Sequence, residues 1–293
     1  MSFEQLGLIG CGLMGGSFAL ALKRAGLVKR VVGYSKSPST TDRARQLGVI
    51  DVEAPSALLA ISGADIVLVA VPVAATESTL KSIRHLVTPS TLVMDVGSTK
   101  GDVVQAAERA LREQIGSFVP AHPITGKEVS GVDHADPDLY TGKYVILTPG
   151  PATLPKQVQQ AHDVWTALGC KVVQMSPKAH DATFAAVSHL PHLLAFAMMH
   201  GMANQPNGEE YLALAGPGFR DFTRIAASDP KMWRDIFLAN KEELLAQNRI
   251  FLHALQTLEH VIVQDNGGAL ESLIEEASRT RARWNMASFN PKK

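Results

Sequence analysis

The stretch LGLIGCGLMG at residues 6–15 decides the fold, because a short apolar run leads directly into the pattern G-x-G-x-x-G. Residues 13–25 then show the spacing of a helix, which Gly26 ends. A glycine loop between a strand and a helix near the start of a chain is typical of the βαβ unit that binds dinucleotides. The alternative is a glycine-rich turn that binds no ligand.

Each glycine of this loop has a physical role in a dinucleotide site. Gly10 permits the tight turn, Gly12 lets a pyrophosphate approach the backbone, and Gly15 lets the helix pack close to the sheet. The free N–H groups at the start of the helix would receive the phosphates. We therefore expect the cofactor-binding residues of the loop to be Gly10, Gly12, Leu13, Met14 and Gly15.

The remainder of the first half alternates apolar runs with helical patterns. This alternation predicts an α/β domain with a doubly wound, parallel, Rossmann-type sheet over residues 1–175. The expected strands are 6–9, 31–34, 66–71, 92–96, 118–121, 143–148 and 171–174, all in one sheet. The expected helices are 13–25, 40–47, 76–86, 103–112 and 155–168. From Ser176-Pro177 onward only helical periodicity remains, which predicts an all-α C-terminal domain over residues 176–293.

Composition excludes several classes of function. The chain has 293 residues, with 28 basic and 28 acidic side chains, so its formal net charge is zero. A dominant nucleic-acid or anionic-membrane function would need a basic surplus. No signal-peptide pattern opens the chain, and no uninterrupted apolar run approaches the length of a membrane span. With Cys11 and Cys170 as its two cysteines, the chain fits a reducing compartment, so we expect a cytoplasmic protein.

The amphipathic helices of the second domain predict a homodimer.

The residues after the second strand bear on the choice between NAD and NADP. NAD-binding units place an acidic residue there, but none occurs before Asp42. Ser35, Lys36 and Ser37 could instead hold a 2′-phosphate, which favours NADP. The alternative is a solvated turn with NAD bound less selectively. Further cofactor contacts are expected where the third and fourth clear strands end, at Val71, Pro72, Ser98 and Thr99, although the last two could be helix caps alone.

Several polar residues are candidates for chemistry. His122 follows a strand, on a loop with Thr125, Gly126, Lys127 and Glu128, and a histidine near neutral pKa is the usual base for removing a hydroxyl proton. A structural histidine is the alternative. Ser188, His189 and His192 share a helix, where substrate hydrogen bonding is favoured over a metal site because no third ligand has suitable spacing, and we expect no metal. Arg224 could bind a substrate carboxylate or pair with Asp221.

A series of motifs carries a family resemblance. In chain order they are GCGLMG (10–15), GSTKG (97–101), HPITG (122–126), SHLPH (188–192) and DFTRIAASDPKMW (221–233). This series resembles the prephenate/arogenate (cyclohexadienyl) dehydrogenases, and it covers nearly the whole chain. The resemblance implies an NAD(P)-dependent oxidative decarboxylation that converts prephenate to 4-hydroxyphenylpyruvate, or arogenate to tyrosine. The choice between the two substrates stays open.

The resemblance also implies roles for individual residues. His122 matches the catalytic histidine that hydrogen-bonds the ring 4-hydroxyl, and Ser98 matches the serine that orients this hydroxyl and the nicotinamide. Arg224 matches the arginine that binds a substrate carboxylate. His192, supported by His189 and Ser188, matches a position near the substrate side chain, and Lys127 and Glu128 match positions that shape the pocket. The rival interpretations are a 3-hydroxyacid dehydrogenase or imine reductase of similar build, and a non-catalytic NADP sensor.

Overall fold

The computed structural model describes residues 2–127 and 129–284. The chain divides into two compact units, Met1–Leu244 and Leu245–Lys293. The first unit contains both sheets, and its strands end at Gln174. The expected boundary between domains at residue 175 stays a prediction, because it marks the change from strands to helices and not the division between the compact units.

The main sheet has six parallel strands in the order β3-β2-β1-β4-β5-β6. This is the strand order of the Rossmann fold, so the predicted fold class is confirmed. The order reverses between β1 and β4, and the ends of both strands meet there, because the Ala70 N–H donates to the Ile9 carbonyl at 2.7 Å. The strands are β1 Phe3–Ile9, β2 Val28–Tyr34, β3 Val52–Glu53, β4 Ile66–Val69, β5 Leu92–Asp95 and β6 Phe118–Val119.

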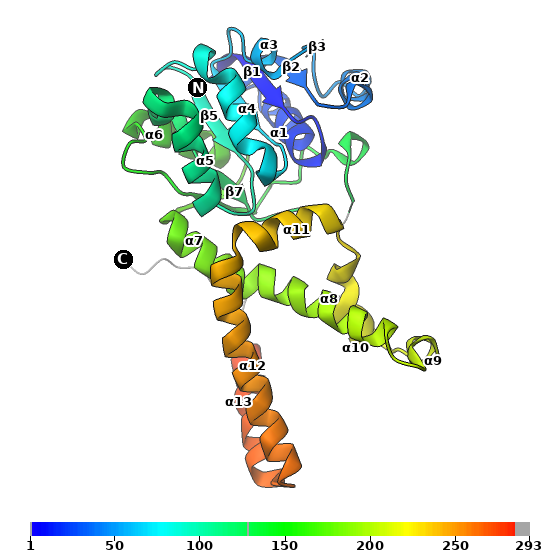
Figure 1. Ribbon diagram of the computed structural model, residues 1–293. Helices are drawn as coiled ribbons and strands as arrows, with labels where there is room; N and C mark the ends of the chain where they lie inside the picture. Colours follow the sequence, from blue (N-terminus) through cyan, green and yellow to red (C-terminus); the bar gives the residue numbers. More distant parts are fainter. Residues whose placement is uncertain (1, 128, 285–293) are drawn as a thin grey trace. The chain divides into compact units, whose positions relative to one another are not determined.

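Both faces of the sheet are covered by helices, as Figure 1 shows. Strand side chains alternate between two apolar clusters, so that Ile66 and Leu68 pack with α1 and α6 while Val67 and Val69 pack with α4 and α5. This burial on both faces explains why the strand sequences are continuously apolar. The helices of this part are α1 Leu13–Arg24, α2 Pro38–Gln46, α3 Ala57–Ala60, α4 Thr76–Ile83, α5 Gly101–Leu111 and α6 Pro155–Ala167.

The later strands do not join the main sheet, contrary to the sequence prediction. β7 (Ala121–Pro123), β8 (Tyr144–Leu147) and β9 (Lys171–Gln174) form a second sheet, in which β7 and β8 are antiparallel. Pro120 separates β6 from β7. Proline has no N–H to donate to a ladder, and the expected strand 118–121 is divided at Pro120. The switch to the second sheet carries His122 onto β7.

The helices after β9 begin at Pro177, where the Ser176 hydroxyl accepts from the Ala179 N–H at 3.1 Å. Within the described residues after 176 there is no strand, as predicted. In the first compact unit these helices are α7 Pro177–Phe184, α8 Leu190–Ala203, α9 Gly208–Ala213, α10 Pro217–Thr223 and α11 Pro230–Ala239. A π-helical turn, Ala185–His189, joins α7 to α8. α12 (Lys241–Val263) begins in the first unit, and α13 (Gly267–Arg283) lies in the second.

The run Pro177–Ala203 is continuous helix, and Pro191 and His192 lie within it. Pro191 follows directly after the π-helical turn Ala185–His189, where the regular pattern of backbone hydrogen bonds is already interrupted. By length and composition this run could cross a membrane, but one such helix in the described residues is weak evidence, because core helices of soluble proteins pass the same test. His180 and His189 on this run are buried in the first unit, at 0% and 1% exposure.

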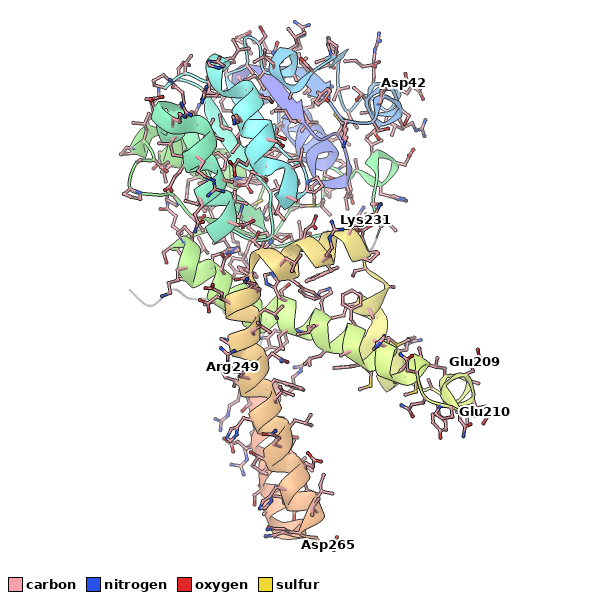
Figure 2. All side chains as sticks on the ribbon, in the orientation of Figure 1. Asp42, Glu209, Glu210, Lys231, Arg249 and Asp265 are labelled. Atoms are coloured by element: carbon pink, nitrogen blue, oxygen red, sulfur yellow. The ribbon has the colours of Figure 1, made fainter. Side chains whose placement is uncertain are left out.

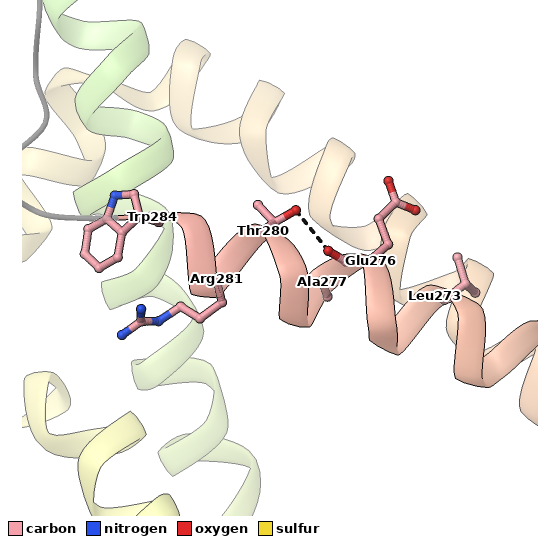
Figure 3. Close-up of a pocket in the computed structure, with 6 residues that line it drawn as sticks. All are labelled: Leu273, Glu276, Ala277, Thr280, Arg281 and Trp284. Carbon is pink, nitrogen blue, oxygen red and sulfur yellow. Dashed lines mark hydrogen bonds between the residues drawn. The ribbon is translucent and has the colours of Figure 1, made fainter.

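The second unit exposes much of its apolar surface. Ile262 and Val263 at the end of α12 are 56% and 76% exposed, and Ile274 on α13 is 54% exposed. One shallow groove on this unit is lined by α13 and the residue that follows it (Figure 3); its lining is Leu273, Glu276, Ala277, Thr280, Arg281 and Trp284. The Arg281 guanidinium lies over the Trp284 ring at 5.1 Å.

Candidate active site

The glycine loop has the backbone geometry that the sequence predicts. Gly10 has φ +97, and a Cβ there would lie 2.2 Å from the Ala70 carbonyl oxygen. A Cβ on Gly15 would lie 2.0 Å from the Gly10 carbonyl oxygen, so the helix start and the loop are in direct contact. A Cβ on Gly12 would meet nothing within 4 Å. The loop is therefore open at Gly12 and closed by packing at Gly10 and Gly15, as a pyrophosphate site at a helix N-terminus requires.

Neighbouring side chains hold this loop in place. The Cys11 N–H donates to the Ser35 hydroxyl at 2.8 Å, and the Tyr140 hydroxyl donates to the Met14 carbonyl at 2.7 Å. Leu13 is buried and Met14 is half-buried against the core, so only their backbone N–H groups suit a phosphate. Ser35 thus links the end of β2 to the glycine loop.

The turn after β2 is exposed and hydroxyl-rich. Lys36 and Ser37 are exposed, and the Ser37 hydroxyl lies 2.8 Å from that of Ser39 at the start of α2. Asp42, the first acid after β2, lies on α2 (Figure 2). Its carboxylate accepts from the Gln46 amide at 2.8 Å. The Asp42 carboxylate is therefore hydrogen-bonded to a residue of its own helix.

The ends of β4 and β5 carry the other expected cofactor contacts. Val71 is half-buried and Pro72 is exposed directly after β4, while Ser98 is half-buried and Thr99 is buried after β5. The sequence did not single out Lys100 as a site residue, but the structure buries its side chain completely beside this region. Its ammonium donates to the Asp95 carboxylate and to the Ala121 carbonyl at 2.9 Å.

Asp95 also accepts from the Ala121 N–H at 3.0 Å. The buried pair of Asp95 and Lys100 therefore fixes both backbone polar groups of the residue before His122. This contact ties β7, which carries His122, to the end of β5 in the main sheet.

His122 lies at the end of a hydrogen-bonded chain of side chains. Its Nδ1 is 2.8 Å from His180 Nε2, and His180 Nδ1 is 2.8 Å from the Asp181 carboxylate. The ring of Phe184 packs against both imidazoles, with centroid distances of 4.9 Å to His122 and 4.5 Å to His180. One ring nitrogen of His122, Nε2, is left for a substrate.

Electrostatics keep these imidazoles neutral. Burial lowers the pKa of His122 well below 6.5, and the nearby His180, Lys100 and His189 lower it further. Burial also lowers the pKa of His180, although Asp181 opposes this effect. A neutral imidazole carries a lone pair and can accept a proton, so His122 has the protonation state of a general base at neutral pH.

The SHLPH motif provides two differently placed histidines. His189 is buried on the π-helical turn, where its Nδ1 accepts from the Asn240 amide at 3.1 Å, and burial lowers its pKa to about 4. His192 is half-buried and donates from Nδ1 to the Ser188 carbonyl at 2.9 Å. Its ring stacks on Trp233, with a centroid distance of 3.5 Å. Burial lowers the pKa of His192 as well.

The loop after His122 and the α10 region are more exposed. Thr125 donates to the Leu139 carbonyl at 3.1 Å, and Gly126 is exposed. Lys127 is engaged with Asp136 at 2.9 Å, and Glu128 lies outside the described residues. Arg224 is exposed at the start of the 3₁₀ turn Arg224–Ala227, which packs against α8.

Sequence reasoning missed part of this site. The sequence patterns do not identify His180, Asp181, Asn240, Phe184 or Lys100 as residues of the site. The one available signal was the adjacent pair His180-Asp181 early in the first helix of the helical region. Asn240 donates to the Asp181 carbonyl across 59 positions of sequence, and such a contact leaves no local pattern.

Comparison with known families decides the assignment. Residues 18–174 match the family described as "Prephenate dehydrogenase, nucleotide-binding domain", and residues 176–276 match "Prephenate dehydrogenase, dimerization domain". The chain belongs to the prephenate dehydrogenase family. The members of this family are oxidoreductases, and the two matches together span most of the chain.

Individual relatives agree with this membership. The chain is 36% identical to a prephenate dehydrogenase of Bacillus subtilis, over 88% of this chain and 70% of that protein. It is 32% identical to a cyclohexadienyl dehydrogenase of Zymomonas mobilis, over 95% of each. The structure resembles that of prephenate dehydrogenase from A. aeolicus in complex with hydroxyphenyl propionate and NAD⁺, with a TM-score of 0.89, 37% identity, and coverage of 96% of this chain and 98% of that one.

Proposed function

We propose that this chain is a nicotinamide-dependent dehydrogenase that oxidatively decarboxylates prephenate, arogenate or both, in the formation of tyrosine. The observation that carries the proposal is the hydrogen-bonded chain from His122 through His180 to Asp181, on a strand that is tied to the carboxyl end of β5 in the Rossmann sheet. Membership of the prephenate dehydrogenase family supports it. The rival hydroxyacid dehydrogenase and sensor interpretations do not account for both family matches.

The reaction assigns a task to each group. The ring carbon that bears the 4-hydroxyl loses a hydride, the hydroxyl becomes a carbonyl, and loss of CO₂ completes an aromatic ring. When bound, the nicotinamide supplies the hydride acceptor. His122 Nε2 accepts the hydroxyl proton, and Ser98, at the end of β5, orients that hydroxyl. Because little other charge develops, positioning contributes much of the rate.

The variant His122→Asn tests this assignment. Purified wild-type protein should release CO₂ and reduce the nicotinamide with prephenate or arogenate. The variant should lose about 10²–10⁴-fold in kcat with a small change in KM, because it lacks the base but keeps the binding contacts. Near-normal turnover by the variant would remove His122 from the chemistry, and the absence of turnover by the wild type would remove the function.

The proposed cofactor preference is NADP over NAD. Lys36 and Ser37 are exposed beside the N-terminus of α2, where a cation, a hydroxyl and the helix dipole can all contact a 2′-phosphate. The acid that would favour NAD is absent from the turn, and Asp42 is bonded to Gln46. Ser35 contributes mainly through its contact with the glycine loop.

The proposed substrate contacts lie on the helical side. Arg224 would bind a substrate carboxylate through a charge-assisted bond. His192, held on Trp233 with Nδ1 donating, presents a neutral Nε2 acceptor to the substrate side chain. This acceptor can accept a hydrogen bond from the ammonium of arogenate; it makes no hydrogen bond to the keto group of prephenate, but it carries no charge that would exclude it, so both substrates remain open.

We further propose that the protein is a homodimer through its helical region. Residues 176–276 match a domain described by its dimerization, and the helices there have exposed apolar side chains, which include Val187 in the first unit at 66% exposure and Ile250 and Val263 in the second at 64% and 76%. A second copy would bury them and contribute apolar stabilisation. Sedimentation equilibrium should give twice the chain mass, and a single-chain mass would contradict the dimer.

A further inference from the structure

We propose that His180 and Asp181 are positioning residues that fix the tautomer of His122, so that its lone pair is always on Nε2. The proposal rests on the proposed function, in which His122 is the base. It assigns to this pair a role beyond packing, acting through His122 and without touching the substrate.

The argument starts at the Asp181 carboxylate. One oxygen accepts from the Lys100 N–H at 2.9 Å and from His180, and the other accepts from the Gly101 N–H at 2.7 Å. Burial opposes the ionisation of Asp181, but these hydrogen bonds outweigh it and hold its pKa below the usual value. Asp181 is therefore a carboxylate, which can only accept hydrogen bonds.

The tautomers follow in sequence from that carboxylate. Because Asp181 only accepts, His180 must carry its proton on Nδ1, and a neutral His180 then has a lone pair on Nε2. That lone pair accepts the Nδ1–H of His122 at 2.8 Å. His122 consequently carries its proton on Nδ1 and its lone pair on Nε2. This is the tautomer that a proton acceptor facing the substrate needs.

The surrounding protein holds this chain of groups rigidly. Asp181 lies at the N-terminus of α5, where the helix dipole favours a negative charge. The Asn240 amide donates to the Asp181 carbonyl at 2.9 Å and so ties α11 to the same point. Phe184 covers both imidazole rings. When His122 accepts a proton from the substrate, the new positive charge lies in line with the buried carboxylate, which stabilises it through His180.

A merely structural role is the alternative, in which His180 and Asp181 only pack the helical region against the sheets. The two roles differ in what they change. A structural role would alter folding and substrate binding together, whereas a positioning role would lower kcat and leave KM and folding in place.

The matched pair His180→Phe and His180→Gln tests the positioning role. Phenylalanine keeps an aromatic ring but removes the acceptor for His122, so kcat should fall about 10²-fold with KM changed less than about threefold. Glutamine keeps a carbonyl acceptor and should retain kcat to within about tenfold of the wild type. Equal kcat in the two variants would overturn the proposal.

Asp181→Ala and Asp65→Ala form a second matched pair. Both carboxylates accept from two consecutive backbone N–H groups, which for Asp65 are those of Glu4 and Gln5, but only Asp181 reaches a histidine. Asp181→Ala should lower kcat about 10–10²-fold, and Asp65→Ala should leave it unchanged. A similar loss in both variants would show that the carboxylate has only a structural role.

A measurement on the wild-type protein reports the tautomer directly, and a variant serves only to identify the His122 signals. Nitrogen-15 NMR of histidine-labelled enzyme, with the His122 signals identified by their loss in His122→Asn, reports which ring nitrogen carries the proton. The proposal requires a protonated Nδ1 and a bare Nε2 at neutral pH without substrate. A protonated Nε2 would overturn it even in an enzyme that turns over prephenate, and the required tautomer in an inactive protein would instead count against the proposed function.

Discussion

Replacement of Gly12 by alanine should separate cofactor binding from folding. A Cβ at Gly12 meets no protein atom within 4 Å, and the backbone φ of −75 is one that alanine adopts freely. The variant should therefore keep the Tm of the wild type to within about 2 °C. In the bound state, however, the added methyl group would occupy the space through which a pyrophosphate approaches the loop.

The size of the binding defect follows from the contacts at stake. Loss of one charge-assisted hydrogen bond between a phosphate and the loop costs about 1.5–3 kcal/mol. This corresponds to an increase in cofactor Kd of about 10–100-fold. Fluorescence titration with NADPH and NADH measures Kd, and thermal denaturation without cofactor measures folding on the same samples.

Gly15→Ala is the matched contrast. Its Cβ would lie 2.0 Å from the Gly10 carbonyl oxygen and 3.1 Å from Ala70 Cβ, so the helix start and the loop must separate. We expect a loss of about 1–3 kcal/mol in the free energy of unfolding, together with weaker binding. Wild-type cofactor affinity in Gly12→Ala would refute the placement of the pyrophosphate. Unchanged stability in Gly15→Ala would refute the described packing.

Three further predictions concern charge. Because burial lowers the pKa of His189 from 6.5 to about 4, the unfolded chain binds a proton below pH 6.5 that the folded chain does not, and the free energy of unfolding falls as pH decreases through this window. The full contribution of His189 to the free energy of unfolding is about 3 kcal/mol. Between pH 7 and 4.5 the free energy of unfolding, measured by chemical denaturation, should therefore fall less in His189→Gln than in the wild type. An equal fall in both proteins would contradict the burial of His189 as a neutral side chain. Lys36→Ala should raise the KM for NADP about tenfold and leave that for NAD unchanged; a parallel change in both would remove Lys36 from the phosphate site. Arg224→Ala should raise the substrate KM about 10–100-fold with less effect on kcat, and an unchanged KM would place it outside the pocket.

Local patterns predicted the main sheet well. Apolar runs at β1, β4 and β5 and the glycine loop are short-range signals, and the predicted requirements at Gly10 and Gly15 are met. The two-residue strand β3 was missed because so short a run has no periodicity. The prediction that β7, β8 and β9 join the main sheet was wrong because periodicity identifies strands but not their partners, and only Pro120 marks the change of sheet.

The candidate site was predictable only where a motif carried it. His122, His189 and His192 belong to recognisable strings, but Asp181 and Asn240 act through contacts between distant segments. The bond from Lys100 to Asp181 spans 81 positions. A buried polar group needs a hydrogen-bond partner, and in these cases the fold supplies that partner from a distant segment of the chain. The amphipathic helices after residue 176 likewise showed an apolar face without showing what covers it.

The most direct test of the central claim is a steady-state matrix with purified protein: prephenate and arogenate, each with NAD and with NADP, followed by formation of reduced nicotinamide. We expect turnover with at least one substrate and a higher kcat/KM with NADP than with NAD. Efficient use of NAD alone would contradict the role given to Lys36 and Ser37. No turnover in any combination would contradict the proposed function.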